Sequence, residues 1–181
     1  MLGISIFVSS YLWKQKNKIN NNLYSDTIKE ICKNIVTNEM GNHNNEPKTH
    51  GELVFEKYGM QGAGIRLEAQ NGFPIVFNDV LPFLAKELTT DTYKNKDKFN
   101  KILSSALLII ISRLNDSNIL YRKGLETLNE LKLKADNVLK QKCSYLEFCN
   151  YCKAENISPG GSADILAVAL FFFFMKNELN K

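Results

Sequence analysis

The sequence predicts an all-α fold, a bundle of several helices, and three observations support that prediction. Apolar residues recur three and four positions apart along most of the chain, which is the spacing of one helix face. The apolar–polar alternation of half-buried strands is nearly absent, and the β-branched residues lie within helical patterns. Helix-start signals, such as the pair Thr49 and Glu52, stand ahead of apolar runs. We therefore expect helices packed on helices.

Length, composition and charge are those of an ordinary globular protein. The chain has 181 residues, of which 44% are hydrophobic and 23% charged, so we expect residues 1–181 to form a single helical domain. The net charge is +4, but the lysines are scattered among acids and asparagines instead of forming an arginine-rich stripe. That distribution argues against nucleic-acid binding and fits a surface that attracts small anions.

The first helices are predicted from apolar spacing and start signals. Residues 2–13 are apolar from the outset, without a cap, and resemble a helix entered midway. A polar loop at 14–22 precedes Ser25, which we expect to cap a helix whose apolar face runs over 28–36. A second polar loop is expected at 41–48.

A capping box opens the next predicted helix. The Thr49 hydroxyl and the Glu52 carboxylate can each accept a hydrogen bond from the other residue's backbone N–H, and Gly59 is expected to end the helix. The glycine-rich segment 62–74 predicts a short helix and a turn. A further helix follows, in which Pro82 marks a kink or a fresh start.

The sequence predicts four helices in the second half of the chain. The last of them contains an apolar run at 165–175, which is far shorter than the ~20 residues that a membrane-spanning helix needs. We expect a buried core helix there and no membrane span. The predicted helices are 94–113, about 119–142, about 144–155, and Ser162 to about Leu179.

The four cysteines indicate a reducing compartment. No secretory signal precedes them, so we expect a cytoplasmic protein. Cys149 and Cys152 have the spacing of half a zinc site, but only Cys143 and the two histidines, His43 and His50, are available to complete it. Thiols on a helix face are the favoured interpretation.

A glycine-rich loop before the last helix is the most informative segment. Gly160 and Gly161 let the backbone approach a ligand closely, and the free amides at a helix start, between Ser158 and Ser162, suit a phosphate. The alternative is an ordinary connection with Ser162 as helix cap. Asp164 in the first turn would repel a bare phosphate, a conflict that a magnesium ion between them would resolve.

A second segment, 115–124, places a carboxylate and two cations around a helix start. Asp116 can hold a metal ion, while Arg122 and Lys123 can meet phosphate oxygens. The alternative is that Asp116 or Asn118 caps a helix beside a solvated basic turn.

Three further polar residues are candidates near the middle of the chain. Arg66 and Glu68 lie two apart, so on one helix they point in different directions and should reach separate partners. His50 lies inside the capping box, where it can donate to a phosphate or a hydroxyl or simply serve the local structure.

Taken in order, five elements of the chain resemble the triphosphoribosyl-dephospho-CoA synthase family. The last element is the most specific of the five. They are Thr49-His50-Gly51-Glu52 with Tyr58-Gly59, Arg66-x-Glu68 ending in Gly72-Phe73-Pro74, Leu81-Pro82, Asp116-Ser117-Asn118 to Gly124-Leu125-Glu126, and Ile157 to Asp164. Family motifs similar to PKPGLVD and NTHKG are absent, so the resemblance implies a carboxy-terminal portion, truncated or half of a split enzyme.

The resemblance implies pentosyl transfer from ATP to dephospho-CoA with release of adenine. The product is the precursor of the prosthetic group of citrate lyase or malonate decarboxylase. Such chemistry passes through an oxocarbenium-like state, for which Glu68, Asp116 and Asp164 are the candidate catalytic carboxylates. Asp116 and Asp164 would also hold Mg²⁺. The candidate substrate-binding residues are His50, Arg66, Arg122, Lys123, Ser158, Gly160, Gly161 and Ser162.

Other interpretations stay open at this point. A companion chain could supply the missing region, or the chain could form a homodimer. The chain could instead be a non-catalytic nucleotide-binding module, or a remnant of the enzyme. A third possibility is an interaction protein that uses its exposed first helix, residues 2–13, as an apolar docking surface.

Overall fold

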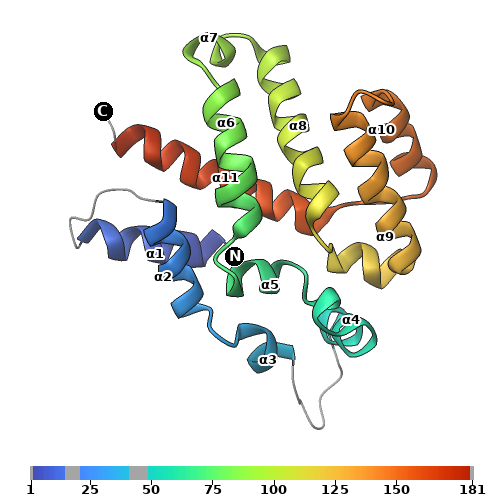
Figure 1. Cartoon of the computed structure of the whole chain (residues 1–181), viewed down its shortest axis with the longest axis horizontal. Helices are drawn as coiled ribbons and strands as arrows, with labels where there is room; N and C mark the ends of the chain where they lie inside the picture. The colour runs from blue at the N-terminus through green and yellow to red at the C-terminus, as the bar shows by residue number, and fades with distance from the viewer. Residues whose placement is uncertain (1, 15–20, 41–48, 180–181) are drawn as a thin grey trace.

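The computed structural model describes residues 2–14, 21–40 and 49–179, and every regular element in these ranges is a helix (Figure 1). The all-α prediction is therefore confirmed. The loop predicted at 41–48, with His43, lies outside the described residues, as does most of the loop predicted at 14–22.

The helices follow one another along the chain with short connections. Two of the elements are not α-helices: η1 is a 3₁₀ helix and η2 a π-helix. The elements are α1 (Leu2–Lys14), α2 (Asn21–Ile31), α3 (Ile35–Met40), α4 (His50–Tyr58), η1 (Gly59–Ala63), α5 (Ile65–Gln70), η2 (Ile75–Val80), α6 (Leu81–Glu87), α7 (Thr90–Tyr93), α8 (Lys96–Arg113), α9 (Ser117–Leu139), α10 (Tyr145–Ala154) and α11 (Gly160–Leu179).

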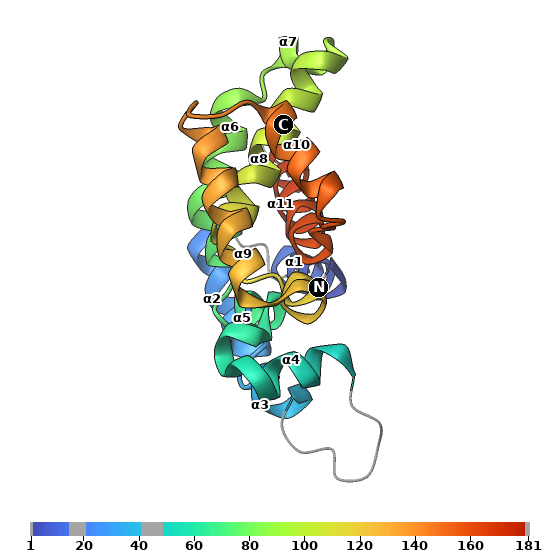
Figure 2. The same cartoon turned by 90° about the vertical axis from the view of Figure 1, so that its right-hand side faces the viewer.

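The helices are arranged in two layers. In Figure 1, α6, α8 and α9 stand side by side, and α11 crosses behind α6 and α8. The side view shows α2, α6 and α9 in one layer and α1, α10 and α11 in the other (Figure 2). The start of α9 and the start of α11 come from different layers, so contacts between them tie the layers together.

Apolar burial forms two clusters, and each of them joins helices of both layers. One core cluster joins α1, α2, η2, α6, α8 and α11, and a second joins α4, α8, α9 and α10. The last helix contributes as its apolar run predicts, because Ile165, Val168, Ala169, Phe172 and Phe173 are all buried. Within the described residues, the structure contains no helix with the length and apolarity that crossing a membrane would require.

The prediction of one capped helix at 25–36 is wrong in two ways. The helix starts four residues earlier, at Asn21, and Ser25 lies inside it, where its hydroxyl donates to the Gly72 carbonyl at 2.9 Å. Asn34 then adopts a left-handed backbone (φ 61°), which ends α2 and starts α3. The Ser25 hydroxyl, which the sequence suggests as a helix cap, is used instead in a hydrogen bond to a residue 47 positions away.

Most other boundaries agree with the sequence. The Thr49–Glu52 capping box is present, and Gly59 ends α4 with φ 57°. Pro82 lies in the first turn of α6, directly after the π-helix, and the backbone stays helical through Val80 and Leu81. One feature was not predicted: Gly124 (φ 85°, ψ −178°) interrupts α9 and separates its first two turns from the remainder.

The first helix is partly covered. Val8 and Leu12 are buried, as are Ser5 and Ser9, and the Ser9 hydroxyl donates to the Ser5 carbonyl at 2.7 Å. On the other side of α1, Ile6, Phe7 and Tyr11 are exposed. A docking role for this helix stays a prediction.

Candidate functional site

A single carboxylate, that of Asp116, caps two helices. Asp116 is the N-cap of α9, and its Oδ1 accepts from the Asn118 backbone N–H at 3.0 Å. Its Oδ2 accepts from the Ser162 backbone N–H at 2.9 Å and from the Ser162 hydroxyl at 3.2 Å. Asp116 is only 1% exposed, so this bridge between the starts of α9 and α11 is buried.

The bridge changes the interpretation of the glycine-rich loop. The last helix begins at Gly160, not at Ser162, and the cap of its first turn is Asp116, not Ser162. A methyl group on Gly161 would lie 3.1 Å from each Asp116 carboxylate oxygen, so glycine is what allows the carboxylate to approach. The Gly160 N–H donates to the Ser158 carbonyl at 2.9 Å.

A third segment, which contains Gly64 and lies near the middle of the chain, packs against the start of α9. Gly64 has φ 55°, and a methyl group on it would lie 2.9 Å from Ser117 Oγ and 3.3 Å from the Asn115 carbonyl oxygen. This close approach sets the start of α5 against the turn between α8 and α9. Two of the five family-like elements thus meet at Asp116, and the segment just before a third, Arg66-x-Glu68, packs against Ser117 beside them.

Glu68, on α5, is a half-buried carboxylate with a raised pKa. Burial raises the pKa of Glu68 to about 7, against the lowering effect of a hydrogen bond that Oε2 accepts from the Ile75 N–H at 3.1 Å. The negative charge of Asp79 raises it further. Near neutral pH, this group can both accept and release a proton.

Arg66 has its own partner, as its spacing from Glu68 predicts. Its Nε donates to Glu39 Oε2 at 2.6 Å, and its Nη1 lies 3.4 Å from the position of a methyl group on Gly51. Arg66 is therefore beside the first turn of α4, which begins at His50.

His50 is stacked on an aromatic ring that the sequence did not single out. The His50 and Tyr121 rings are 3.9 Å apart, centroid to centroid, at an interplanar angle of 18°. Tyr121 lies on the first part of α9, directly before Arg122 and Lys123. Both of these cations are exposed, and neither forms an ion pair with another described residue.

The two predicted magnesium ligands have different surroundings. Asp116 is buried and accepts three hydrogen bonds, one at Oδ1 and two at Oδ2, so most of its acceptor positions are already used, and magnesium at Asp116 stays a prediction. Asp164 is exposed, on the first turn of α11. Within the described ranges, no three or more His, Cys, Asp or Glu side chains group to hold a metal. Magnesium at Asp164, together with a ligand phosphate, stays a prediction.

The cysteines are unpaired thiols. Cys149 and Cys152 both lie on α10. Burial, and then the neighbouring Cys149, raise the pKa of Cys152 to about 11, which keeps this thiol protonated near neutral pH, whereas a zinc ligand must lose its proton.

Sequence reasoning missed three charged residues that support the turn between α8 and α9. Arg113 Nη1 contacts Asp79 Oδ1 at 2.5 Å, which links the end of α8 to η2. Lys132 Nζ donates to the Arg113 carbonyl at 3.0 Å and to Asn115 Oδ1 at 2.9 Å. Burial lowers the pKa of Lys132. These partners are far apart in sequence, so no local spacing indicates them.

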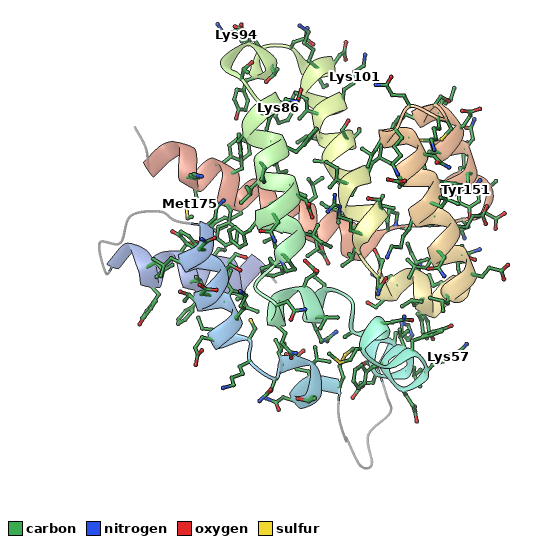
Figure 3. All side chains as sticks on the ribbon, viewed as in Figure 1. Lys57, Lys86, Lys94, Lys101, Tyr151 and Met175 are labelled. Atoms are coloured by element: carbon green, nitrogen blue, oxygen red, sulfur yellow. The ribbon has the colours of Figure 1, made fainter. Side chains whose placement is uncertain are left out.

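A cavity of about 620 Å³ lies away from these residues. It opens along the amino-terminal part of α8, where Figure 3 places Lys101 near one end of the molecule, opposite the end that holds Lys57 on α4. None of the candidate residues predicted from the sequence lines it. Its walls are Asp97, Asn100, Lys101, Ser104, Ser105, Leu108, Val138 and Tyr145.

Comparison with known proteins agrees with the resemblance. The profile of the family described as CitG, ATP:dephospho-CoA triphosphoribosyl transferase, matches residues 13–181. A 2-(5''-triphosphoribosyl)-3'-dephosphocoenzyme-A synthase of Haemophilus ducreyi is 33% identical over 161 residues, which is 83% of this chain and 46% of the relative. A probable synthase of Vibrio cholerae is 30% identical over 181 residues, 94% of this chain and 56% of the relative.

These matches define the family and the extent of the likeness. The chain spans about half the length of the curated relatives it matches. The profile covers most of the chain, so it gives no support to the narrower expectation that only a carboxy-terminal portion of the family is present. No solved structure gives a significant match. The chain belongs to the ATP:dephospho-CoA triphosphoribosyl transferase family.

Proposed function

We propose that this protein takes part in the transfer of a triphosphoribosyl group from ATP to dephospho-CoA, with release of adenine. The Asp116 bridge is the observation that supports this most, because it joins two elements of the family resemblance, the starts of α9 and α11, in one buried contact. The names of the relatives describe the same product.

The proposed reaction forms one bond and breaks one at the anomeric carbon of the ATP ribose. A ribose hydroxyl of dephospho-CoA attacks that carbon, the bond to adenine breaks, and adenine leaves with the electron pair. The hydroxyl proton passes to a general base, and the departing adenine takes up a proton. Glu68 is our candidate base, because its pKa of about 7 lets it accept a proton near neutral pH.

The remaining carboxylates receive different roles in this proposal. Asp116 accepts three hydrogen bonds and is buried, so we assign it to positioning the two helix starts, not to proton transfer. Asp164 is exposed beside the start of α11 and is our candidate for contact with a magnesium ion bound to the triphosphate.

The triphosphate is proposed to bind to cations at the starts of α4 and α9. Arg122 and Lys123 have no carboxylate partner among the described residues, so their charges are available to an anion. Arg66 shares its charge with Glu39 and would reach the ligand from the side of α4. At the start of α11, the Gly160 and Ser162 N–H groups already donate to the Ser158 carbonyl and to Asp116, so Ser158 and Gly161 are the candidates that stay for contact with the phosphates.

Partners and pathway belong to the proposal as well. The product would serve the prosthetic group of citrate lyase or malonate decarboxylase in the cytoplasm. We also propose that a companion chain or a second copy takes part in the site. Measuring the mass of the purified protein in solution, alone and after capture from its own cells, tests this.

The activity is tested by incubating the purified chain with ATP, dephospho-CoA and Mg²⁺ and measuring adenine and the triphosphoribosyl product. Assays with and without the remaining part of a longer relative, supplied in trans, allow for a divided site. Glu68→Gln is expected to lower adenine release about a hundredfold. Glu155→Gln, an exposed change on the distant α10 end, is the control. No adenine release in either assay would contradict the proposal, whereas ATP binding without turnover would favour a nucleotide-binding module.

A further inference from the structure

The stacked pair formed by His50 and Tyr121 presents an aromatic surface, and Tyr121 is followed in α9 by two cations that form no ion pair with another described residue. Among the aromatic contacts between described residues, this pair is the one with nearly parallel rings, at 18°, whereas the others are tilted or edge-to-face. Tyr121 remains 42% exposed even with His50 stacked on it. Both residues of the pair are therefore in part open to solvent and to a ligand.

Both rings are held by rigid helix starts. His50 is the first residue of α4, whose start is fixed by hydrogen bonds in both directions between Thr49 and Glu52. Tyr121 lies in the first two turns of α9, between the Asp116 cap and the break at Gly124. A stacking surface on fixed elements loses little conformational entropy when a ligand binds.

The charges around the pair suit the anionic part of a nucleotide. Arg122 and Lys123 follow Tyr121 directly, and Arg66 lies beside the first turn of α4. Purine rings stack on aromatic side chains, and phosphates bind to arginine and lysine. An aromatic surface on helix starts that also carry these cations is therefore suited to a ligand that has a flat base at one end and phosphates at the other.

We propose that the His50–Tyr121 stack binds the adenine ring of a nucleotide substrate, with the phosphates directed to Arg66, Arg122 and Lys123. This deepens the proposed function and rests on it, because ATP and dephospho-CoA both contain adenine. It gives His50 a stacking role in place of a hydrogen-bond donor role, and it adds Tyr121 to the site.

The test compares ligands with and without a base. ATP, dephospho-CoA and inorganic tripolyphosphate are titrated calorimetrically into the wild-type chain, Tyr121→Leu and Tyr121→Phe. Loss of one stacking contact should weaken binding of the adenine ligand roughly fivefold to a hundredfold in Tyr121→Leu. Tripolyphosphate affinity should not change, and Tyr121→Phe, which keeps the ring, should remain close to wild type. Tyr11→Leu, at an exposed tyrosine on α1, is the matched control.

Each outcome has a defined meaning. A loss confined to ATP assigns the surface to the adenine of the donor, and a loss confined to dephospho-CoA assigns it to the adenine of the acceptor. Unchanged affinity of Tyr121→Leu for both nucleotides, or an equal loss for tripolyphosphate, would overturn the inference while leaving the proposed function intact. If the wild-type chain binds neither nucleotide, the inference fails, and the proposed function is then decided by the adenine-release assay with the remaining part supplied in trans.

Discussion

Two kinds of helix start can be compared in this molecule. The start of α10 is capped locally: Ser144 and Glu147, three residues apart, exchange hydrogen bonds in an exposed capping box. The start of α11 is capped from a distance by Asp116, which is buried and is also the N-cap of α9. The comparison teaches that a local cap fixes one helix, whereas the distant cap also fixes the position of one helix relative to another.

The two starts should therefore respond differently to mutation. Removing the local cap exposes backbone donors to water, which can replace the lost acceptor. Removing Asp116 leaves three donated hydrogen bonds without an acceptor in a buried place, where each unsatisfied group costs about 1–3 kcal/mol.

The largest effect is expected for Asp116→Ala. We expect the free energy of unfolding to fall by about 3 kcal/mol, because buried donors on α9 and α11 lose their acceptor together. Urea denaturation followed by circular dichroism measures it. A loss no larger than that of a local cap variant would show that the bridge contributes nothing beyond an ordinary cap.

A smaller loss is expected for Gly64→Ala, which attacks the third segment of the junction. The change forces a left-handed φ of 55° on alanine and places its methyl group 2.9 Å from Ser117 Oγ. We expect a loss of about 2 kcal/mol. Gly3→Ala, in α1 where nothing lies within 4 Å, is the control and should be neutral or stabilising by about 1 kcal/mol. Equal behaviour of the two variants in thermal unfolding would contradict the close packing.

The local cap itself provides the next comparison. Ser144→Ala should lower the free energy of unfolding by about 1 kcal/mol and leave ATP affinity unchanged, since α10 lies away from the candidate site. Denaturation and calorimetry on the same preparation check both parts. A drop in ATP affinity would mean that the two regions are coupled.

Two glutamates that accept hydrogen bonds from backbone N–H groups have pKa values shifted in opposite directions. We expect the smallest changes in the free energy of unfolding from the titration of these two groups. Burial, above all, raises the pKa of Glu68 to about 7, while hydrogen bonds from Ser144 lower that of exposed Glu147. The stability contributed by protonated Glu68 is fully present below the pKa that this group has in the unfolded chain, and it is lost as pH rises through the folded-state pKa of about 7. The stability contributed by ionised Glu147 is present above the pKa that this group has in the unfolded chain, and it is lost as pH falls through the lower pKa of the folded state. Side-chain NMR titration of both carboxyls is the measurement, and shifts in the same direction would contradict the burial argument.

The sequence predicted the parts of the fold that local patterns encode. The capping box at Thr49 and the helix end at Gly59 are within four residues of their partners, so they could be recognised. The sequence also indicated Asp116 as a helix cap, one of the alternatives it left open. It could not show that Asp116 caps α11 too, because that bond joins residues 46 positions apart.

Long-range contacts also explain the other differences. Ser25 was expected to cap its own helix, but its hydroxyl contacts Gly72. Lys132 and Arg113 support the turn before Asp116 through bonds that no helix period predicts. The candidate site was thus predicted as a set of residue types on helix starts, whereas its internal connections depend on tertiary packing.

The central claim is that the buried Asp116 carboxylate organises the nucleotide site by holding α9 and α11 together. The most direct test is titration of ATP into Asp116→Asn, a variant that keeps the size of the side chain but sets an amide against N–H donors. Circular dichroism first confirms that the variant is folded. The account predicts at least a tenfold loss of ATP affinity, about 1.4 kcal/mol, relative to the wild-type chain. Equal or tighter binding of ATP by the folded variant would contradict it.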